Sequence, residues 1–144
     1  MKSGQVRAIA LGIIRDGDRV LLLEGYDPSK RETFYRPLGG GIEFGERSQE
    51  TVRRELREEI GVEVTDLEFL ATIESVFTFD GLAGHEITLI YTARLADPAL
   101  TRQAVISGAE PDGTPIAAVW KPLDDFRAGR DPLYPDGLLE LLDE

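Results

Sequence analysis

The alternation of apolar and polar residues predicts β-strands along the first third of the chain. Two runs rich in apolar and β-branched residues, 6–15 and 19–24, flank Asp16-Gly17-Asp18, a sequence typical of a tight hairpin turn. We therefore expect two antiparallel strands here. A polar loop at 25–32 follows, and then a short strand at 33–38 that ends at three consecutive glycines, after which we expect a loop.

The rest of the chain repeats the strand pattern and adds short helices. Two long strand-like runs, 67–79 and 86–95, predict a second hairpin. The segment 97–115 holds three prolines and little periodicity, so we expect a variable loop with at most a short helical turn. The last expected elements are a strand at 116–120, a helical turn at 123–127 and a helix at 137–142.

Residues 48–60 have the period of a helix. Val52, Leu56 and Ile60 form one apolar stripe, Ser48 is suited to cap the N-terminus, and Gly61 is suited to the position after the last turn. Strands, a central helix, more strands and a closing helix predict an α+β domain with helices packed on a mixed sheet.

Length and composition narrow the possibilities. With 144 residues, 42% of them hydrophobic, we expect one domain over residues 1–144. The absence of cysteine excludes disulfides, thiolate metal sites and cysteine nucleophiles. No apolar run is long enough for a membrane span and the first residues lack a signal-peptide layout, so we expect a cytoplasmic protein without membrane contact.

The formal net charge of −11 argues against nucleic acid as a partner, because binding to a phosphate backbone needs a basic surface. A small anionic substrate would need a metal ion and a few local basic groups.

Three glutamates stand out on the predicted helix. At about 100° per residue, Glu55, Glu58 and Glu59 share one side, and like charges at this spacing cost about 0.2–0.5 kcal/mol per pair. Two readings explain them. The arginines of the same helix could make an ordinary solvated charged face, or the carboxylates could bind a divalent metal ion, for which hard oxygen ligands are suited.

The flanking residues favour the second reading, because the whole segment resembles the signature of the Nudix hydrolase family. That signature places glycine, glutamate, arginine and aliphatic residues at fixed separations, and it is matched by Gly40, Glu46, Arg54, Glu55, Leu56, Glu58, Glu59, Gly61 and Val62. A second segment, 118–126, resembles the late strand and turn of the family. One departure is Leu38, which stands where many members have proline.

The resemblance implies an α/β/α sandwich with a mixed sheet between helices, and a pyrophosphohydrolase that depends on Mg²⁺ or Mn²⁺. Glu55, Glu58 and Glu59 would bind the metal together with a backbone carbonyl of Gly39 or Gly40, and one glutamate would also serve as the base. By the same resemblance, Arg54 pairs with Glu46 or with the ligand carboxylates and fixes the loop to the helix.

Further candidates lie outside the signature. Many relatives supply one more glutamate from a distant strand or loop, and Glu86 is our first candidate, with Glu74 and Glu110 behind it. His85 is a candidate base or phosphate contact, or else a surface residue. Arg36, and in the preceding loop Arg31 or Lys30, are candidates for substrate phosphates. Several aromatic residues either stack on a nucleobase or pack in the core: Tyr35, Phe77, Phe79 and Tyr134.

The leading functional prediction is metal-dependent cleavage of the phosphoanhydride of nucleoside diphosphate derivatives, first of all small nucleotides such as nucleoside triphosphates. Dinucleoside polyphosphates and nucleotide sugars are alternative substrates. A non-catalytic nucleotide-binding module of the same family and a purely structural acidic helix are alternatives from other classes. We expect a monomer or a homodimer.

Overall fold

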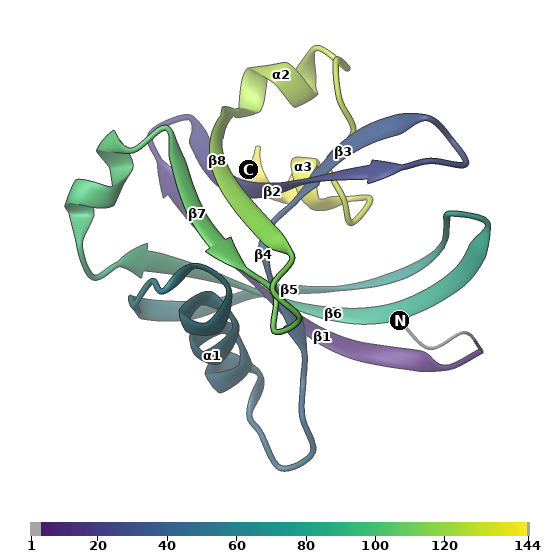
Figure 1. Ribbon diagram of the computed structural model, residues 1–144, viewed down its shortest axis with the longest axis horizontal. Helices are drawn as coiled ribbons and strands as arrows, with labels where there is room; N and C mark the ends of the chain where they lie inside the picture. Colours follow the sequence, from purple (N-terminus) through teal and green to yellow (C-terminus); the bar gives the residue numbers. More distant parts are fainter. Residues whose placement is uncertain (1–3, 144) are drawn as a thin grey trace.

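The computed structural model describes residues 4–143 and confirms an α+β fold built on a mixed sheet (Figure 1). The strand order is β5-β6-β1-β2-β8-β7, with β3 added on β2 and β4 on β1. The sheet is mixed because β1 pairs with β6 in parallel. The elements are β1 (Val6–Asp16), β2 (Arg19–Asp27), β3 (Glu32–Arg36), β4 (Leu38–Gly41), α1 (Ser48–Ile60), β5 (Val64–Phe79), β6 (Leu82–Leu95), η1 (Pro98–Arg102), β7 (Val105–Ala109), β8 (Pro115–Pro122), α2 (Leu123–Arg127) and α3 (Leu138–Leu142).

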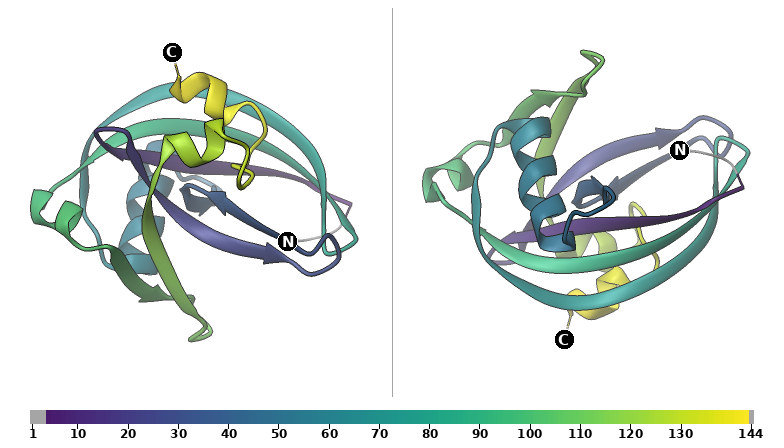
Figure 2. Two further views of the ribbon diagram at one scale, coloured as in Figure 1. Left: turned by 90° about the horizontal axis from the view of Figure 1, so that it is seen from above. Right: turned by 90° about the horizontal axis from the view of Figure 1, so that it is seen from below.

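Strand β1 lies between two hydrophobic cores. Ala10 and Ile14 pack with Leu56 of α1, whereas Ile13 packs on the other face with Leu138 of α3. This alternation follows from the two-residue period of a strand. Helix α1 therefore covers one face, and α2 and α3 cover the other (Figure 2), which is the predicted sandwich. Within residues 4–143, no helix is long and apolar enough to cross a membrane.

Both predicted hairpins are present. β1 and β2 pair antiparallel around the expected turn, but only at Arg15 with Val20 and Asp16 with Arg19, after which β1 pairs with β4 and β6 instead. β5 and β6 form the second hairpin and turn at Asp80 and Gly81. β5 begins three residues earlier than predicted, at Val64, and β6 begins four residues earlier, at Leu82, directly after the turn.

The strand predicted at 33–38 is present as β3 but ends two residues early. The polar loop predicted at 25–32 is shorter than expected, because β2 continues to Asp27, and the loop predicted at the glycines is wrong. β3 ends at Arg36 and β4 begins at Leu38, with Pro37 between them, which has no N–H to donate to a sheet. The glycines belong to β4, which pairs with β1. Gly39 has φ 148, and a Cβ there would lie 2.0 Å from the Ala10 carbonyl oxygen, so only glycine permits this approach.

The segment 97–115 contains the predicted helical turn, η1, but also a strand that the sequence did not predict. β7 pairs antiparallel with β8 and lies against the end of α1. A Cβ at Gly108 would lie 1.7 Å from the Glu59 carbonyl oxygen. The position of β7 therefore depends on its close packing against the helix, which the sequence pattern of the segment did not reveal.

The helix boundaries are nearly as predicted. Arg47, not Ser48, is the N-cap of α1, and the Ser48 hydroxyl instead hydrogen-bonds the Tyr91 hydroxyl of β6. Gly61 adopts the predicted left-handed conformation, φ 66, and ends the helix.

Candidate active site

Arg54 of α1 is the centre of the glutamate cluster. Its Nε donates to Glu46 Oε2 at 2.7 Å and its Nη2 donates to Glu46 Oε1 at 3.0 Å. Nη2 also donates to the Gly41 carbonyl at 3.0 Å. One side chain thus connects the helix, the loop before it and the end of β4, which is the pairing predicted for Arg54 and Glu46.

Glu46 is held as a carboxylate. The hydrogen bonds from Arg54 and then from the Thr51 hydroxyl, which lies 2.6 Å away, lower the pKa of Glu46 to about 2. In return, Glu46 first and Glu55 next raise the pKa of Arg54 above its ordinary value. This pair stays ionised throughout the pH range in which proteins fold.

The remaining guanidinium nitrogen of Arg54 contacts two of the three helix glutamates. Nη1 donates to Glu55 Oε1 at 2.9 Å and to Glu58 Oε2 at 3.3 Å. The reading in which arginines neutralise the acidic helix is therefore partly realised in the structure. Arg57 takes no part, because it pairs with Glu63 at 2.7 Å.

Glu59 differs from the other two glutamates because it is buried, with 6% of its surface exposed. Its Oε1 atom is buried and has no hydrogen-bond partner in the part of the chain that the structure describes. Burial raises the pKa of Glu59 to about 8, and the Glu55 and Glu110 carboxylates add to the rise, whereas the Arg36 guanidinium opposes it. Burial disfavours the ionised carboxylate, and a nearby cation would both stabilise the charge and give the free oxygen a partner.

Gly40 makes room for the glutamates. A Cβ at Gly40 would lie 2.6 Å from both Cδ and Oε1 of Glu55. The helix can approach β4 this closely only because the strand has no side chain at this position.

The donor set fits Mg²⁺ or Mn²⁺, since it consists of carboxylate oxygens and includes the unpartnered oxygen of Glu59. Across residues 4–143, no three His, Cys, Asp or Glu side chains are already gathered in a metal-binding arrangement. The contacts of Arg54 explain this, because they draw Glu55 and Glu58 toward the guanidinium. A metal ion would have to replace Arg54 Nη1 as their counter-charge.

Among the residues predicted to contact substrate, Arg36 is the one whose charge acts on the glutamate cluster. It ends β3, and its positive charge lowers the pKa of Glu59. Its Nε is buried and has no hydrogen-bond partner among the described residues. Lys30 and Arg31 lie in the β2–β3 turn, where Lys30 pairs with Asp27 at 3.9 Å and Arg31 is exposed with φ 53.

Three of the candidates for an additional acid or base, Glu74, His85 and Glu86, lie together on the β5–β6 hairpin. Glu86 pairs with Arg7 of β1 at 3.5 Å, and His85 pairs with Glu74 at 2.8 Å across the β5–β6 hairpin. Of the three candidate glutamates, Glu110 is the one whose charge raises the pKa of Glu59. Sequence reasoning missed Arg7, whose only signal was a cation in an otherwise apolar strand.

The aromatic candidates divide into two groups. Tyr35 is a core residue, with its ring 5.7 Å from that of Phe126, and its hydroxyl donates to Glu24. Phe79 and Tyr134 instead both contact Phe34, with ring centroids 6.0 and 5.5 Å from that of Phe34. This second group brings together β3, the end of β5 and the segment before α3.

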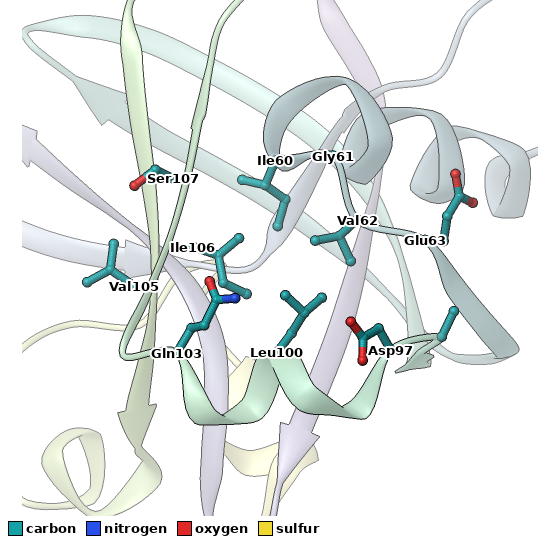
Figure 3. A pocket seen from close by; sticks show the side chains of 11 residues that line it. Ile60, Gly61, Val62, Glu63, Asp97, Leu100, Gln103, Val105, Ile106 and Ser107 are labelled. Carbon is teal, nitrogen blue, oxygen red and sulfur yellow. The ribbon is translucent and has the colours of Figure 1, made fainter.

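A separate groove of about 720 Å³ lies at the C-terminal end of α1, between η1 and β7 (Figure 3). Aliphatic side chains form its floor: Ile60, Val62, Leu100 and Ile106. The carboxylates of Glu63 and Asp97 lie at its edge. None of the described residues that line it is basic or aromatic, so it is unsuited to a nucleotide.

Comparison with known proteins agrees with this geometry. A family model for the NUDIX domain matches residues 4–141. Over 68 residues the chain is 37% identical to the human protein NAD(P)H pyrophosphatase NUDT13, mitochondrial, a match that covers 47% of this chain and 19% of that protein. Over 60 residues it is 40% identical to the NAD-capped RNA hydrolase NudC of Pseudomonas aeruginosa, covering 42% and 21%.

The match thus spans about a fifth of the length of these two curated relatives. A solved structure titled NUDIX hydrolase from Nitrosomonas europaea superposes with a TM-score of 0.65 at 17% identity, over 96% of this chain and 87% of that one. This likeness concerns the fold.

Proposed function

The chain belongs to the NUDIX domain family, and on that basis we propose that it is a hydrolase that uses Mg²⁺ or Mn²⁺ to cleave the phosphoanhydride bond of a nucleoside diphosphate derivative. The observation that carries the proposal is the buried Glu59, with its unpartnered Oε1, beside Glu55 and Gly40. The two curated relatives are named as a pyrophosphatase and a hydrolase, which supports the same reaction class.

Each residue of the cluster has a proposed role. Glu55, Glu58 and Glu59, with a carbonyl of Gly39 or Gly40, would hold the metal ion, which when bound neutralises phosphate charge and lowers the pKa of a bound water. Arg54 and Glu46 would hold the helix and the loop before it in a fixed relative position through their two hydrogen bonds. The unpartnered Nε of Arg36 supports a role in donating to a phosphate oxygen.

Two substrate classes are proposed. Small nucleotides such as nucleoside triphosphates suit a chain of net charge −11, because long nucleic acid would be repelled. The names of the two curated relatives favour a second class, dinucleotides of the NAD type joined by a pyrophosphate. A cytoplasmic location, a monomer or homodimer, and roles for Glu86, His85 and Arg31 stay predictions.

The test is a panel of nucleoside triphosphates, dinucleoside polyphosphates, nucleotide sugars and NAD-type dinucleotides, with products identified by mass spectrometry. We expect Mg²⁺-dependent release of a nucleoside monophosphate that is lost in Glu58→Gln and Glu59→Gln variants that remain folded. Retained turnover in both variants would overturn the mechanism. Tight nucleotide binding without turnover on the whole panel would instead indicate a non-catalytic module.

A further inference from the structure

One face of the β5–β6 hairpin carries a polar patch that lies outside the roles proposed for the helix glutamates, Arg54, Glu46 and Arg36. Glu86 of β6 pairs in register with Arg7 of β1 on one side and with Ser75 of β5 on the other, and Thr88 is the next residue of β6 on the same face. We call Arg7, Ser75, Glu86 and Thr88 the inner polar patch.

The patch faces the β2–β3 hairpin. Phe79 lies on the same face of β5 as Ser75, four residues away, and its ring contacts that of Phe34 on β3. Figure 1 shows the two hairpins one above the other on the same side of the molecule. The polar side chains of the patch are therefore directed between two layers of the fold, and not to the outer surface.

Two hydroxyls of the patch have no partner. Ser75 Oγ and Thr88 Oγ1 are both buried and make no hydrogen bond with any other atom of residues 4–143, and Thr88 is only 1% exposed. Buried polar groups in folded proteins are normally satisfied, so an unsatisfied pair on one face needs an explanation. The ion pair beside them is loose, at 3.5 Å, and the Arg7 side chain is 36% exposed, so this end of the patch reaches solvent.

The patch lies between the glutamate cluster and the aromatic group. At one end, Arg7 Nη2 comes within 3.2 Å of a Cβ built on Gly41, whose carbonyl accepts a hydrogen bond from Arg54. At the other end, Phe79 lies two side-chain steps beyond Ser75, or about 13 Å along the strand at 3.3 Å per residue. A nucleotide with its phosphates at the cluster and its base at the aromatic rings would place its sugar over the patch.

The side chains suit a sugar. Glu86 disfavours a phosphate at this point, whereas its two oxygens can accept hydrogen bonds from neighbouring hydroxyls. Arg7 donates, and the serine and threonine hydroxyls can both donate and accept. We infer that the inner polar patch binds the 2′ and 3′ hydroxyls of a ribose, so that the protein selects ribonucleotide over 2′-deoxyribonucleotide substrates. This inference rests on the proposed function.

The test uses variants that remove the unpartnered hydroxyls without changing shape much, Ser75→Ala and Thr88→Val. The control is Thr78→Val, an exposed threonine on the opposite face of β5. The measured quantity is the ratio of kcat/KM for a ribonucleoside triphosphate, or another substrate that the panel identifies, to kcat/KM for its 2′-deoxy analogue. Melting temperature is measured in parallel.

We expect the wild-type protein and Thr78→Val to prefer the ribonucleotide, and each patch variant to lose about three- to tenfold of this preference, as for the loss of one hydrogen bond. The melting temperature of Thr88→Val should stay unchanged or rise, because an unsatisfied hydroxyl is removed. Equal rates for the two sugars in the wild-type protein, or an unchanged ratio in both variants, would overturn the inference. A lower melting temperature with an unchanged ratio would show a structural role instead.

Calorimetric titration of the same two nucleotides separates failure of this inference from failure of the proposed function. Ribonucleotide-selective binding without hydrolysis supports the sugar site and overturns only the hydrolase. Equal affinity for the two sugars, or no binding of either, overturns the sugar site.

Discussion

Arg54 binds Glu46 through two parallel contacts, Nε to Oε2 at 2.7 Å and Nη2 to Oε1 at 3.0 Å. This geometry uses the planar fork of the guanidinium and leaves Nη1 for Glu55 and Glu58. The same side chain therefore has two tasks. It fixes the loop to the helix, and it provides the positive charge that a metal ion would supply when it binds.

The first prediction concerns this arginine. We expect Arg54→Ala to lower metal-dependent activity about 10- to 100-fold, the usual effect of removing a residue that orients metal ligands. Arg54→Lys should restore little, because a single ammonium group cannot make the two-point contact. The measurement is kcat/KM as a function of Mg²⁺ concentration. Arg57→Ala is the control, since Arg57 pairs with the exposed Glu63, and unchanged kinetics in a folded Arg54→Ala protein would contradict the assigned role.

The second prediction follows from the low pKa of Glu46, about 2 against an ordinary value of 4.5. Because the folded state binds the proton more weakly than the unfolded state, the carboxylate stabilises the fold above pH 4.5. This stabilisation is lost as pH falls from 4.5 through 2. Urea unfolding between pH 5 and pH 2.5 should show a shallower loss of stability in Glu46→Gln than in the wild-type protein. Parallel pH profiles of the two proteins would count against it.

The third prediction uses the opposite shift in Glu59, whose pKa is raised to about 8. Between pH 4.5 and pH 8 the folded protein keeps a proton that the unfolded chain has released, so the free energy of unfolding contributed by this group falls as pH rises. Binding of Mg²⁺ requires the ionised carboxylate, and a ligand that binds the folded state stabilises it.

We therefore expect the rise in melting temperature caused by Mg²⁺ to increase from pH 6 to pH 8.5. Glu59→Gln should show a small rise that does not depend on pH. A Mg²⁺ effect of equal size at both pH values in the wild-type protein would exclude Glu59 as a ligand that must lose its proton.

Much of this fold could be predicted because its signals are local. The apolar stripe of Val52, Leu56 and Ile60 defines α1, and the turn at Asp16-Gly17-Asp18 defines the first hairpin. The family signature is a local signal too, because its fixed spacing is enough to locate the glutamates. The resemblance to the family also predicted that Arg54 pairs with Glu46. The two residues lie on the helix and on the loop just before it, and they are hydrogen-bonded in the structure.

Features that depend on distant contacts could not be predicted. β7 is only five residues long and lies in a segment with three prolines and little periodicity, and it is placed by pairing with β8 and by the approach of Gly108 to Glu59. Glu59 is buried, unlike Glu55 and Glu58, and its backbone carbonyl lies against Gly108 of this strand, which is distant in the sequence. The inner polar patch likewise exists only because the parallel register of β1 and β6 places Arg7 beside Glu86.

The last prediction compares two neighbouring glycines of β4. At Gly39 a Cβ would lie 2.0 Å from the backbone oxygen of Ala10, and φ is 148, so both the space and the backbone conformation exclude alanine. At Gly40 the three atoms nearest to a Cβ all belong to the end of the Glu55 side chain, the closest at 2.6 Å, and a flexible side chain can move aside more easily than backbone.

Gly39→Ala should therefore destabilise the whole protein, by an amount on the order of 2–4 kcal/mol for overpacking combined with backbone strain. Gly40→Ala should retain most of its stability but lose metal-dependent activity, because Glu55 is displaced. Urea unfolding and kcat/KM measured on the two variants check the contrast. If Gly40→Ala is instead as destabilised as Gly39→Ala, the strand and not the glutamate requires this glycine. If Gly40→Ala is folded and fully active, Glu55 is not needed in its observed position.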